Sequence, residues 1–216
     1  MSTAAQPYPH ASDGSTITEV KDEFRALIRA ARQARSPRRR AEAADALVDV
    51  VETIPALADA RCVAVYSARP TEPDTGPLLD ALAARGVDVL LPVLGAGLQR
   101  DWARYAGRHD LLQRAPGRPP EPSTPALGPD ALAGADVIVA PALAVDTAGT
   151  RLGQGGGWYD RALAHARPGT PVIALVFAEE LYDAQTRPLP RQPHDRTVDV
   201  VATPERWISL RADGGE

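Results

Sequence analysis

The sequence predicts an α/β fold, a three-layer α/β/α sandwich around a mostly parallel, Rossmann-like open sheet. Five short runs of continuously apolar residues are spread along the chain, which is typical of parallel strands buried on both faces. Segments with helical periodicity alternate with these runs. No stretch of the chain is apolar for long enough to span a membrane, so the apolar runs belong to the interior of a globular fold.

Two helices are expected before the first strand. Apolar residues in 17–34 recur at spacings of three and four, which places them on one helix face. Ser36 followed by Pro37 provides an N-cap and a proline at the first helical position, which predicts a second helix to about Glu52. Residues 1–16 are rich in Ser, Thr, Pro and Gly without periodicity, and they are expected to form a disordered or loosely attached tail.

After these helices the pattern changes to that of strands. Residues 75–85 are expected to form a helix that stops at Gly86, and residues 98–105 a small hairpin or an edge strand. Residues 116–129 are a proline-rich connection. Residues 17–210 therefore form a single domain, and the ligands of such sheets bind beyond the carboxyl ends of the strands. The five expected parallel strands are residues 62–66, 87–92, 135–141, 170–176 and 198–202.

Charge and cysteine content exclude several classes of protein. The 216 residues carry a formal net charge of -4, and this acidic excess argues against a nucleic-acid partner. The single cysteine, Cys62, excludes an internal disulfide and a cysteine-based metal site, and it suits the reducing cytoplasm. The first residues lack the basic start and apolar run of a secretory signal. We therefore expect a cytoplasmic monomer that binds small molecules and has no membrane partner.

A glycine-rich loop after the third expected strand carries the clearest functional signal. Of residues 153–157, all but one are glycine, so the backbone can approach a ligand closely and turn N–H groups towards phosphate. A helix beginning near Trp158 would add its positive end, and Arg151 offers a two-pronged donor for phosphate. Asp160 is a carboxylate within this anion-binding loop, which is expected where Mg²⁺ bridges protein and phosphates.

Two common nucleotide-binding signatures do not fit this loop. A Walker loop ends in Gly-Lys-Ser/Thr, and this loop contains no lysine. A dinucleotide-binding loop follows the first strand of its unit and has an acid about twenty residues further on. A flexible turn between strand and helix is the remaining alternative, and the Arg, Trp, Tyr and Asp residues beside the glycines argue against it.

The stretch Arg151 to Arg161 closely resembles the Arg-Leu-Gly-x-Gly-Gly-Gly-Tyr-Tyr-Asp-Arg signature of the 5-formyltetrahydrofolate cyclo-ligase family, also called 5,10-methenyltetrahydrofolate synthetase. Gln154 and Trp158 depart from this pattern, since many members have Arg and Tyr there. The resemblance extends over about residues 21–203. Further segments similar to the family, in the same order, are Tyr66 with Glu72-Pro-Asp74-Thr75, Leu91-Pro92-Val93, Glu121-Pro122, Pro141-Ala-Leu-Ala-Val-Asp146 and Pro193-His194-Asp195.

The resemblance implies an ATP- and Mg²⁺-dependent ligase that forms a carbon–nitrogen bond. Its substrate would be 5-formyltetrahydrofolate, and its products 5,10-methenyltetrahydrofolate, ADP and phosphate. ATP would phosphorylate the formyl oxygen, N10 would attack the activated carbon, and phosphate would leave. Such a protein mainly positions two ligands and neutralises the transferring charge.

The resemblance also implies roles for individual residues. Lys21, the only lysine among the 24 Lys+Arg residues, and Arg151 would be catalytic. The residues that would bind ATP are Lys21, Arg25, Arg151, Leu152, Gly153, Gln154, Gly155, Gly156, Gly157, Trp158 and Tyr159. Those that would bind the folate are Tyr66, Glu72, Trp158 and Tyr159, and those that would hold Mg²⁺ are Asp160 and Asp195.

Plainer interpretations stand beside these roles. Lys21 and Arg25 lie four residues apart on one helix face, which could simply be solvated. Glu72 could be an acid at a helix N-terminus, although Asp74 suits that place better. The two aromatic residues of the loop could pack into the core, and a contact of the loop glutamine with phosphate is in doubt because the family's usual residue there is arginine.

Three other functions are compatible with part of the pattern. A non-catalytic module that binds a phosphorylated ligand would be expected to lack Lys21, Asp160 or Asp195, and all three are present. A sugar-phosphate isomerase of similar architecture would need a base for carbon deprotonation and no ATP site. A cyclo-ligase-like paralogue with another substrate is a closer alternative, which the sequence does not separate from the main hypothesis.

Overall fold

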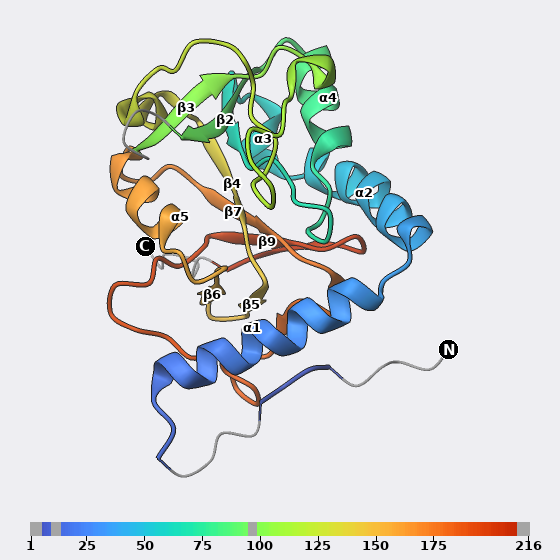
Figure 1. Ribbon diagram of the computed structural model, residues 1–216, viewed down its shortest axis with the longest axis vertical. Coiled ribbons are helices and arrows are strands. Elements are labelled where there is room, and N and C mark those ends of the chain that lie inside the picture. Colours follow the sequence, from blue (N-terminus) through green and yellow to red (C-terminus); the bar gives the residue numbers. More distant parts are fainter. Residues whose placement is uncertain (1–5, 10–13, 95–98, 211–216) are drawn as a thin grey trace.

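The computed structural model describes residues 6–9, 14–94 and 99–210. Its centre is a seven-stranded sheet in the order β10-β9-β7-β4-β1-β2-β3, with parallel inner strands and an antiparallel strand at each edge (Figure 1). This arrangement confirms the predicted α/β fold with a mostly parallel open sheet. The strands are β1 (Cys62–Val65), β2 (Asp88–Leu94), β3 (Arg100–Arg104), β4 (Val137–Pro141), β7 (Val172–Leu175), β9 (Val200–Ala202) and β10 (Trp207–Ser209).

The inner strands are buried on both faces, as their unbroken apolar runs predict. Val63, Ala64 and Val65 of β1 have no exposed surface, because helices cover the sheet on two sides. In Figure 1, α2 and α4 lie on one side of the sheet and α5 lies on the other. None of the helices in the described part of the chain is long and apolar enough to cross a membrane. Besides α1, which is described below, the α-helices of this part are α2 (Pro37–Glu52), α3 (Pro55–Ala58), α4 (Gly76–Ala84) and α5 (Trp158–Ala162).

The two edge strands complete the expected sheet. The weakly alternating stretch contains the edge strand β3, which pairs antiparallel with β2, the strand directly before it in the chain, so it is both an edge strand and one arm of a hairpin. Leu98, the first residue of that expected stretch, lies outside the described residues. β10 pairs antiparallel with β9, with Trp207 opposite Ala202. Its three residues are too few to show a period, which is why the sequence does not predict it.

A second sheet of three strands lies beyond the carboxyl end of β4. It consists of β6 (Arg151–Leu152), β5 (Ala144–Asp146) and β8 (Leu181–Tyr182), and α1 (Ile17–Ala34) crosses it (Figure 1). We call α1 and this sheet the small lobe. Val145 of β5 packs into the main core, whereas the other buried apolar residues of the small lobe belong to a separate cluster made of Phe24, Ile28, Leu143, Ala144, Leu152, Tyr182 and Leu189.

A buried ion pair anchors α1 to the rest of the molecule. Arg32 donates through Nε and Nη2 to the two carboxylate oxygens of Glu180, each at 2.7 Å, and its Nη2 also donates to the carbonyl oxygen of Ala142 at 2.8 Å. Both side chains are almost completely buried. Burial raises the pKa of Glu180 even though Arg32 favours its charged form. The pair therefore carries a desolvation cost, and it fixes where α1 meets the loops after β4 and β7.

Part of the segment expected to be a loose tail contacts the small lobe. The ring of Tyr8 packs edge-on against that of Phe24, with 5.0 Å between centroids. Gln6 Nε2 donates to the carbonyl oxygen of Leu181 at 2.8 Å. Residues 6–9 are therefore attached through specific contacts, whereas most of the rest of the expected tail lies outside the described residues.

Candidate functional site

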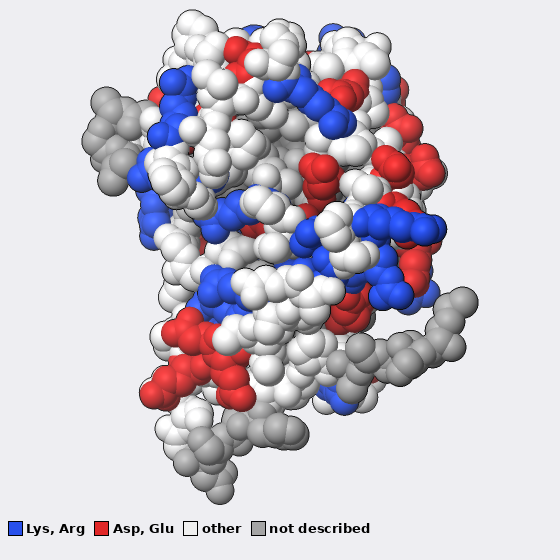
Figure 2. Space-filling view, turned by 45° about the vertical axis from the view of Figure 1, so that its right-hand side comes forward, with Lys and Arg blue, Asp and Glu red and all other residues white. Residues whose placement is uncertain are grey.

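A cavity of about 760 Å³ lies between the sandwich and the small lobe. Figure 2 shows a hollowed face of the molecule that is bordered by basic and acidic side chains. Each residue with an expected site role lines this cavity, so the fold brings together segments that are far apart in the sequence. These residues are Lys21, Arg25, Tyr66, Glu72, Arg151, Leu152, Gly153, Gln154, Gly155, Gly156, Gly157, Trp158, Tyr159, Asp160 and Asp195.

The glycines of the loop are required for different reasons. Gly155 and Gly157 have positive φ angles of 99° and 59°, which side chains disfavour. A Cβ atom on Gly157 would also lie 2.9 Å from Arg161 Nη1. A Cβ atom on Gly156, by contrast, would meet nothing within 4 Å. The backbone itself requires glycine at 155 and 157, whereas Gly156 leaves open space on the cavity wall.

The helix after the loop is short. α5 starts at Trp158 as predicted but has five residues, and its N-cap Gly157 provides no side-chain hydrogen bond. It continues only as the 3₁₀ turn Leu163–His165. Because a helix dipole grows with the number of aligned peptide units, its positive end is weaker than the sequence suggests. The positive charge of this wall comes mainly from its lysine and arginine side chains.

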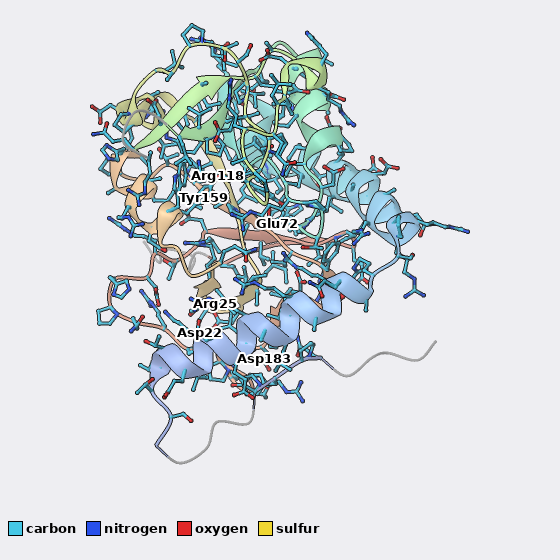
Figure 3. All side chains as sticks on the ribbon, in the orientation of Figure 1. Asp22, Arg25, Glu72, Arg118, Tyr159 and Asp183 are labelled. Atoms are coloured by element: carbon cyan, nitrogen blue, oxygen red, sulfur yellow. The ribbon has the colours of Figure 1, made fainter. Side chains whose placement is uncertain are left out.

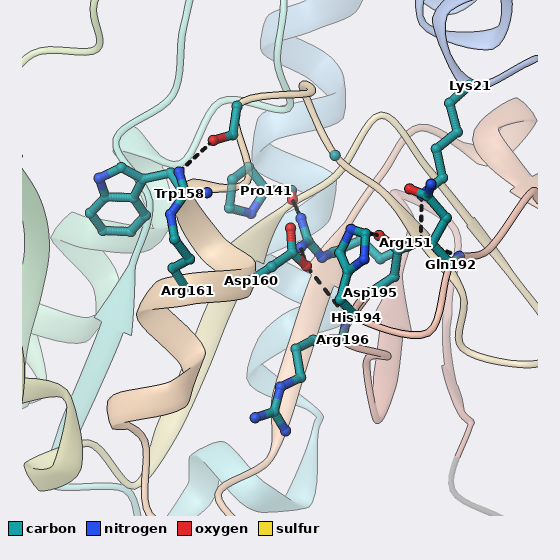
Figure 4. Close-up of polar contacts among 12 residues, drawn as sticks. Lys21, Pro141, Arg151, Trp158, Asp160, Arg161, Gln192, His194, Asp195 and Arg196 are labelled. Carbon is teal, nitrogen blue, oxygen red and sulfur yellow. Dashed lines mark hydrogen bonds and ion pairs between the residues drawn. The ribbon is translucent and has the colours of Figure 1, made fainter. Parts of the chain in front are cut away.

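Lys21 lies on the buried side of α1, with 6% of its surface exposed. Its Nζ forms an ion pair with Asp195 and donates to Gln192 Oε1 at 3.2 Å (Figure 4). Burial disfavours the charge of Asp195, but hydrogen bonds from Lys21 and from the backbone N–H of Gln192, at 2.6 Å, lower the pKa of Asp195. The alternative of a solvated helix face is therefore wrong for Lys21.

Arg151 is buried against Asp160. Its Nη2 donates to Asp160 Oδ1 at 2.7 Å, and its Nη1 donates to the carbonyl oxygen of Pro141 at 3.2 Å (Figure 4). Its Nε is buried without a hydrogen-bond partner. The expected two-pronged donor is thus already engaged by a carboxylate, and a phosphate would have to compete with Asp160 for it.

Asp160 and Asp195 reach the same wall of the cavity. The backbone N–H of Arg196, the residue after Asp195, donates to Asp160 Oδ1 at 3.4 Å (Figure 4). Within the described residues, no group of three or more His, Cys, Asp and Glu side chains could hold a metal ion. Two carboxylates fit Mg²⁺, which takes one or two protein carboxylates and completes its shell with phosphate oxygens and water.

Two arginines of α1 tie the glycine-rich loop to the helix. Arg25 Nε donates to the carbonyl oxygen of Gly153 at 3.0 Å, and its Nη1 pairs with Asp22 at 2.6 Å. Arg29 Nη2 donates to the carbonyl oxygen of Gln154 at 2.9 Å. Arg25 therefore both lines the cavity and supports the loop.

Glu72 is buried just after β1, with 6% of its surface exposed. Its Oε2 accepts a hydrogen bond from the backbone N–H of Arg69 at 2.9 Å, and its Oε1 accepts one from Gln154 Nε2 at 2.8 Å. The acid at the start of α4 is Asp74, whose Oδ1 accepts from the backbone N–H of Gly76 at 2.9 Å. The helix-terminus alternative therefore applies to Asp74 and not to Glu72.

Two tyrosines lie near the charge of Glu72. Tyr66 donates its hydroxyl to the carbonyl oxygen of Pro73 at 2.7 Å, whereas the hydroxyl of Tyr159 is buried without a partner. Burial, and after it the negative charge of Glu72, raise the pKa of both hydroxyls. Tyr159 therefore keeps its proton and has an unused hydrogen-bond donor beside the cavity.

The aromatic residues of the loop both pack and line the cavity. Trp158 lies 5.4 Å from Trp102 of β3 and 4.8 Å from Tyr159, measured between ring centroids. Tyr159 is buried, while Trp158 is partly exposed. The core-packing alternative therefore applies to both rings, and the same cluster forms part of the cavity wall, so that their role in binding stays a prediction.

Sequence reasoning missed some residues of this region. Arg118 lines the cavity, although it belongs to the proline-rich connection, where no site residue was expected. Figure 3 labels it together with Glu72 and Tyr159. Glu121 of the same connection is buried and also lines the cavity. The match of Glu121-Pro122 to the family was a signal for this segment. Arg29 gave no signal, because a cation on an exposed helix face is common.

Comparison with known proteins adds independent findings. The sequence profile of the 5-formyltetrahydrofolate cyclo-ligase family matches residues 17–204. The 5-formyltetrahydrofolate cyclo-ligase of Mycolicibacterium smegmatis is 42% identical over 153 residues, which cover 68% of this chain and 76% of that protein. The protein of the same name from Escherichia coli is 34% identical over 184 residues, which cover 83% of this chain and 98% of that protein.

Solved structures agree with the sequence comparisons. The NMR structure of Aquifex aeolicus 5,10-methenyltetrahydrofolate synthetase superposes with a TM-score of 0.76 at 25% identity, covering 91% of this chain and 95% of that one. The 5,10-methenyltetrahydrofolate synthetase of Mycoplasma pneumoniae has a TM-score of 0.63 at 17% identity, covering 84% of this chain and 96% of that one. The second likeness concerns the fold alone.

Proposed function

Because the chain belongs to the 5-formyltetrahydrofolate cyclo-ligase family, we propose that it uses ATP and Mg²⁺ to convert 5-formyltetrahydrofolate to 5,10-methenyltetrahydrofolate, with residues 17–210 as the catalytic domain. The observation that carries the proposal is that the separate segments resembling the family line one cavity of about 760 Å³. That volume is ample for a folate or a nucleotide, since ligand pockets are about 300–1,000 Å³.

The proposed reaction forms a carbon–nitrogen bond after one phosphoryl transfer. The formyl oxygen attacks the γ-phosphorus of ATP, and the bond from that phosphorus to ADP breaks. N10 then attacks the activated formyl carbon and loses its proton, and the carbon–oxygen bond breaks to release phosphate. The formyl oxygen leaves readily only as phosphate, and ring closure within one molecule gains from proximity.

We assign the phosphates of ATP to the wall formed by α1 and the glycine-rich loop. Lys21 and Arg25 bring positive charge from the helix, and Arg151 brings it from β6. The glycines allow phosphate to approach the backbone, and the open space at Gly156 suits that approach. Lys21 and Arg151 are the proposed catalytic residues, because a fixed positive charge at the transferring phosphoryl group stabilises the transition state.

Asp160 and Asp195 are the residues that would hold Mg²⁺. When bound, this ion supplies charge neutralisation at the phosphate oxygens. Each carboxylate is paired with one of the two proposed catalytic cations, Asp195 with Lys21 and Asp160 with Arg151. The same carboxylates therefore hold Lys21 and Arg151 beside the proposed metal site, and a bound phosphate would share these cations with them.

We assign the folate ring to the opposite wall. Glu72 can accept hydrogen bonds from the N–H donors of the pterin, and it is buried beside Tyr66 and Tyr159. The ring of Trp158 offers a flat surface for stacking, and the free hydroxyl of Tyr159 offers a donor. This assignment places the formyl group between the two walls, where it can meet the phosphoryl group.

The proposal is tested by product formation. The purified protein with ATP, Mg²⁺ and 5-formyltetrahydrofolate is expected to raise near-ultraviolet absorbance as the methenyl product forms. The signal should depend on ATP and disappear when a chelator removes Mg²⁺. A folded protein that forms no product would contradict the proposal, and so would product formation without ATP. Substitution of Arg39, an exposed residue of α2, provides a control that should not change the rate.

A further inference from the structure

One side chain connects the two walls of the cavity. Gln154 Nε2 donates to Glu72 Oε1 at 2.8 Å, across from the glycine-rich loop to the segment after β1. Gln154 Oε1 accepts from Arg29 Nη2 at 3.0 Å and from Arg29 Nε at 3.3 Å. A flipped amide would set oxygen against carboxylate and NH₂ against guanidinium, so these partners fix its orientation. The chain of contacts runs from α1 through Gln154 to Glu72.

The Glu72 carboxylate can accept more hydrogen bonds than the described residues donate to it. Glu72 is buried, and among the described residues no cation lies within ion-pair distance of it. It accepts one hydrogen bond on each oxygen, from Gln154 and from the backbone N–H of Arg69. Each carboxylate oxygen can accept two. A buried charge that lacks a cation is costly unless something else satisfies it, so the remaining positions point to a ligand with N–H donors.

A neutral donor at position 154 has a particular consequence. An amide N–H holds a carboxylate in place without cancelling its charge, whereas an arginine or lysine side chain would neutralise it. Arg29 contacts Gln154 and not Glu72. Its guanidinium donates to the side-chain oxygen and to the backbone carbonyl oxygen of Gln154. Glu72 is thereby oriented by two neutral donors, and neither of them forms an ion pair with it.

We propose that Gln154, held by Arg29, is a positioning residue that orients the Glu72 carboxylate for the N–H donors of the substrate ring and links that carboxylate to α1. The proposal rests on the proposed function in one respect, namely that Glu72 receives the folate. It assigns to Gln154 a role on the folate side of the cavity, distinct from a contact with phosphate.

The kinetic test separates positioning from general support. We expect Gln154→Ala to raise KM for 5-formyltetrahydrofolate about tenfold, the effect of losing one hydrogen bond to a charged group, with kcat and KM for ATP within about twofold of wild type. Arg29→Met should act in the same direction but less, and its effect should shrink in the Gln154→Ala background, where only its hydrogen bond to the backbone carbonyl oxygen of residue 154 remains. Arg39→Met, on α2, is the matched control and should match wild type.

A change of charge at position 154 should alter the pH dependence of kcat/KM, which loss of a merely structural contact would not change. Gln154→Glu sets a second carboxylate beside Glu72. Arg29 favours the charged form of the new carboxylate, but the oxygen that replaces Nε2 faces Glu72 directly, and two carboxylates in contact favour sharing a proton. We therefore expect kcat/KM of Gln154→Glu to be low at pH 8 and to recover, relative to wild type, as the pH falls towards 6. A loss that is equal at both pH values, or a KM for 5-formyltetrahydrofolate in Gln154→Ala equal to that of wild type, would overturn the proposal.

The contact itself is tested without turnover. In a double-mutant cycle of unfolding by urea, Gln154→Glu should destabilise the protein at pH 8, and Glu72→Gln should remove that effect. Absence of coupling in this cycle would overturn the positioning role, whatever the activity. A wild-type protein that forms no methenyl product but shows the coupling would contradict the proposed function while supporting the contact, so the two failures are distinguishable.

Discussion

The sandwich and the small lobe enclose the same cavity but are held together by different interactions. The sandwich has a continuous apolar core that includes Val63, Ala64 and Val65 of β1, the strand that precedes Glu72. The small lobe has a small apolar cluster around Phe24 and Tyr182, and it relies in addition on the buried Arg32–Glu180 pair. The wall that we assign to the folate therefore rests on apolar packing, whereas the position of Lys21 depends on polar contacts between distant segments.

Removal of one partner of the buried Arg32–Glu180 pair should have the largest effect on stability. Arg32→Met leaves the Glu180 carboxylate buried without a cation, and we expect the free energy of unfolding to fall by about 3–5 kcal/mol. Urea unfolding measures the loss. Arg32→Met combined with Glu180→Leu removes both charges and should regain most of the stability, because apolar side chains of similar volume often replace a buried pair without loss. If Arg32→Met alone were as stable as wild type, the pair would not be needed to hold α1 in place.

The next largest effect concerns Lys21, the cation that α1 places in the cavity wall. Lys21→Ala should lower kcat/KM by about 10²–10³-fold, the size seen when one fixed donor to a transition state is removed. Lys21→Arg should recover only part, because a guanidinium is larger and planar and does not replace a compact ammonium charge. The near-ultraviolet assay measures both variants, and thermal unfolding checks that they are folded. Unchanged activity in Lys21→Ala would mean that α1 does not carry the phosphate-contacting cation.

The sequence predicts the two regions to different extents, for physical reasons. Ser36 and Pro37 start α2 as expected, and the apolar runs become inner strands, because these signals are local or periodic. β6 and β8 have two residues each, which is too short for any period. Arg32 and Glu180 are 148 residues apart, and nothing in the sequence marks them as partners.

The candidate site divides in the same way. The glycine-rich loop and the carboxylate Asp195 could be found through the family signature, and they do line one cavity. The pairing of Lys21 with Asp195, and of Arg151 with Asp160, could not, because it depends on how α1 and the loops meet in three dimensions. Residue identities were thus predictable where a motif exists, and contacts between motifs were not.

Two glycine variants separate a requirement of the fold, at Gly157, from a requirement of the proposed ligand, at Gly156. Gly157→Ala should lower the free energy of unfolding by about 1–2 kcal/mol, because its φ of 59° is left-handed. Gly156→Ala should leave stability near that of wild type, since its Cβ meets nothing within 4 Å, but it should raise KM for ATP several-fold. Urea unfolding and kinetics in parallel test this. Equal KM values for Gly156→Ala and wild type would place the phosphates elsewhere.

The N-terminal contact with the small lobe should have a smaller effect. Tyr8→Ala removes a ring that packs against Phe24 and Tyr182, and we expect it to cost about 1 kcal/mol of stability. Tyr8→Phe keeps the ring and loses only the hydrogen bond to the carbonyl oxygen of Pro188, so it should cost less. Hydrogen exchange should locate the loss in α1. Faster exchange in the sandwich instead would mean that the two regions are not separately supported.

The smallest expected effect is a pH dependence at the junction of the two regions. The pKa of Asp195 is lowered in the folded protein, because hydrogen bonds from Lys21 and Gln192 outweigh burial. Its contribution to stability is therefore full above the ordinary aspartate value of about 3.9 and is lost as the pH falls through that value towards the lower folded one. The difference in unfolding free energy between wild type and Asp195→Asn should stay at about 1 kcal/mol, because the asparagine oxygen can still accept hydrogen bonds from Lys21 and from the backbone N–H of Gln192.

That difference should be larger at pH 6 than at pH 3.5, since protonation of Asp195 removes the charge that the asparagine variant lacks at every pH. Urea unfolding of both proteins at the two pH values measures it. Added salt should shrink the difference at pH 6, because an ion pair at a cavity wall is partly screened. A difference independent of pH would mean that Asp195 holds the small lobe through its shape and its neutral hydrogen bonds, and that the pairing with Lys21 serves the bound phosphate and not the fold.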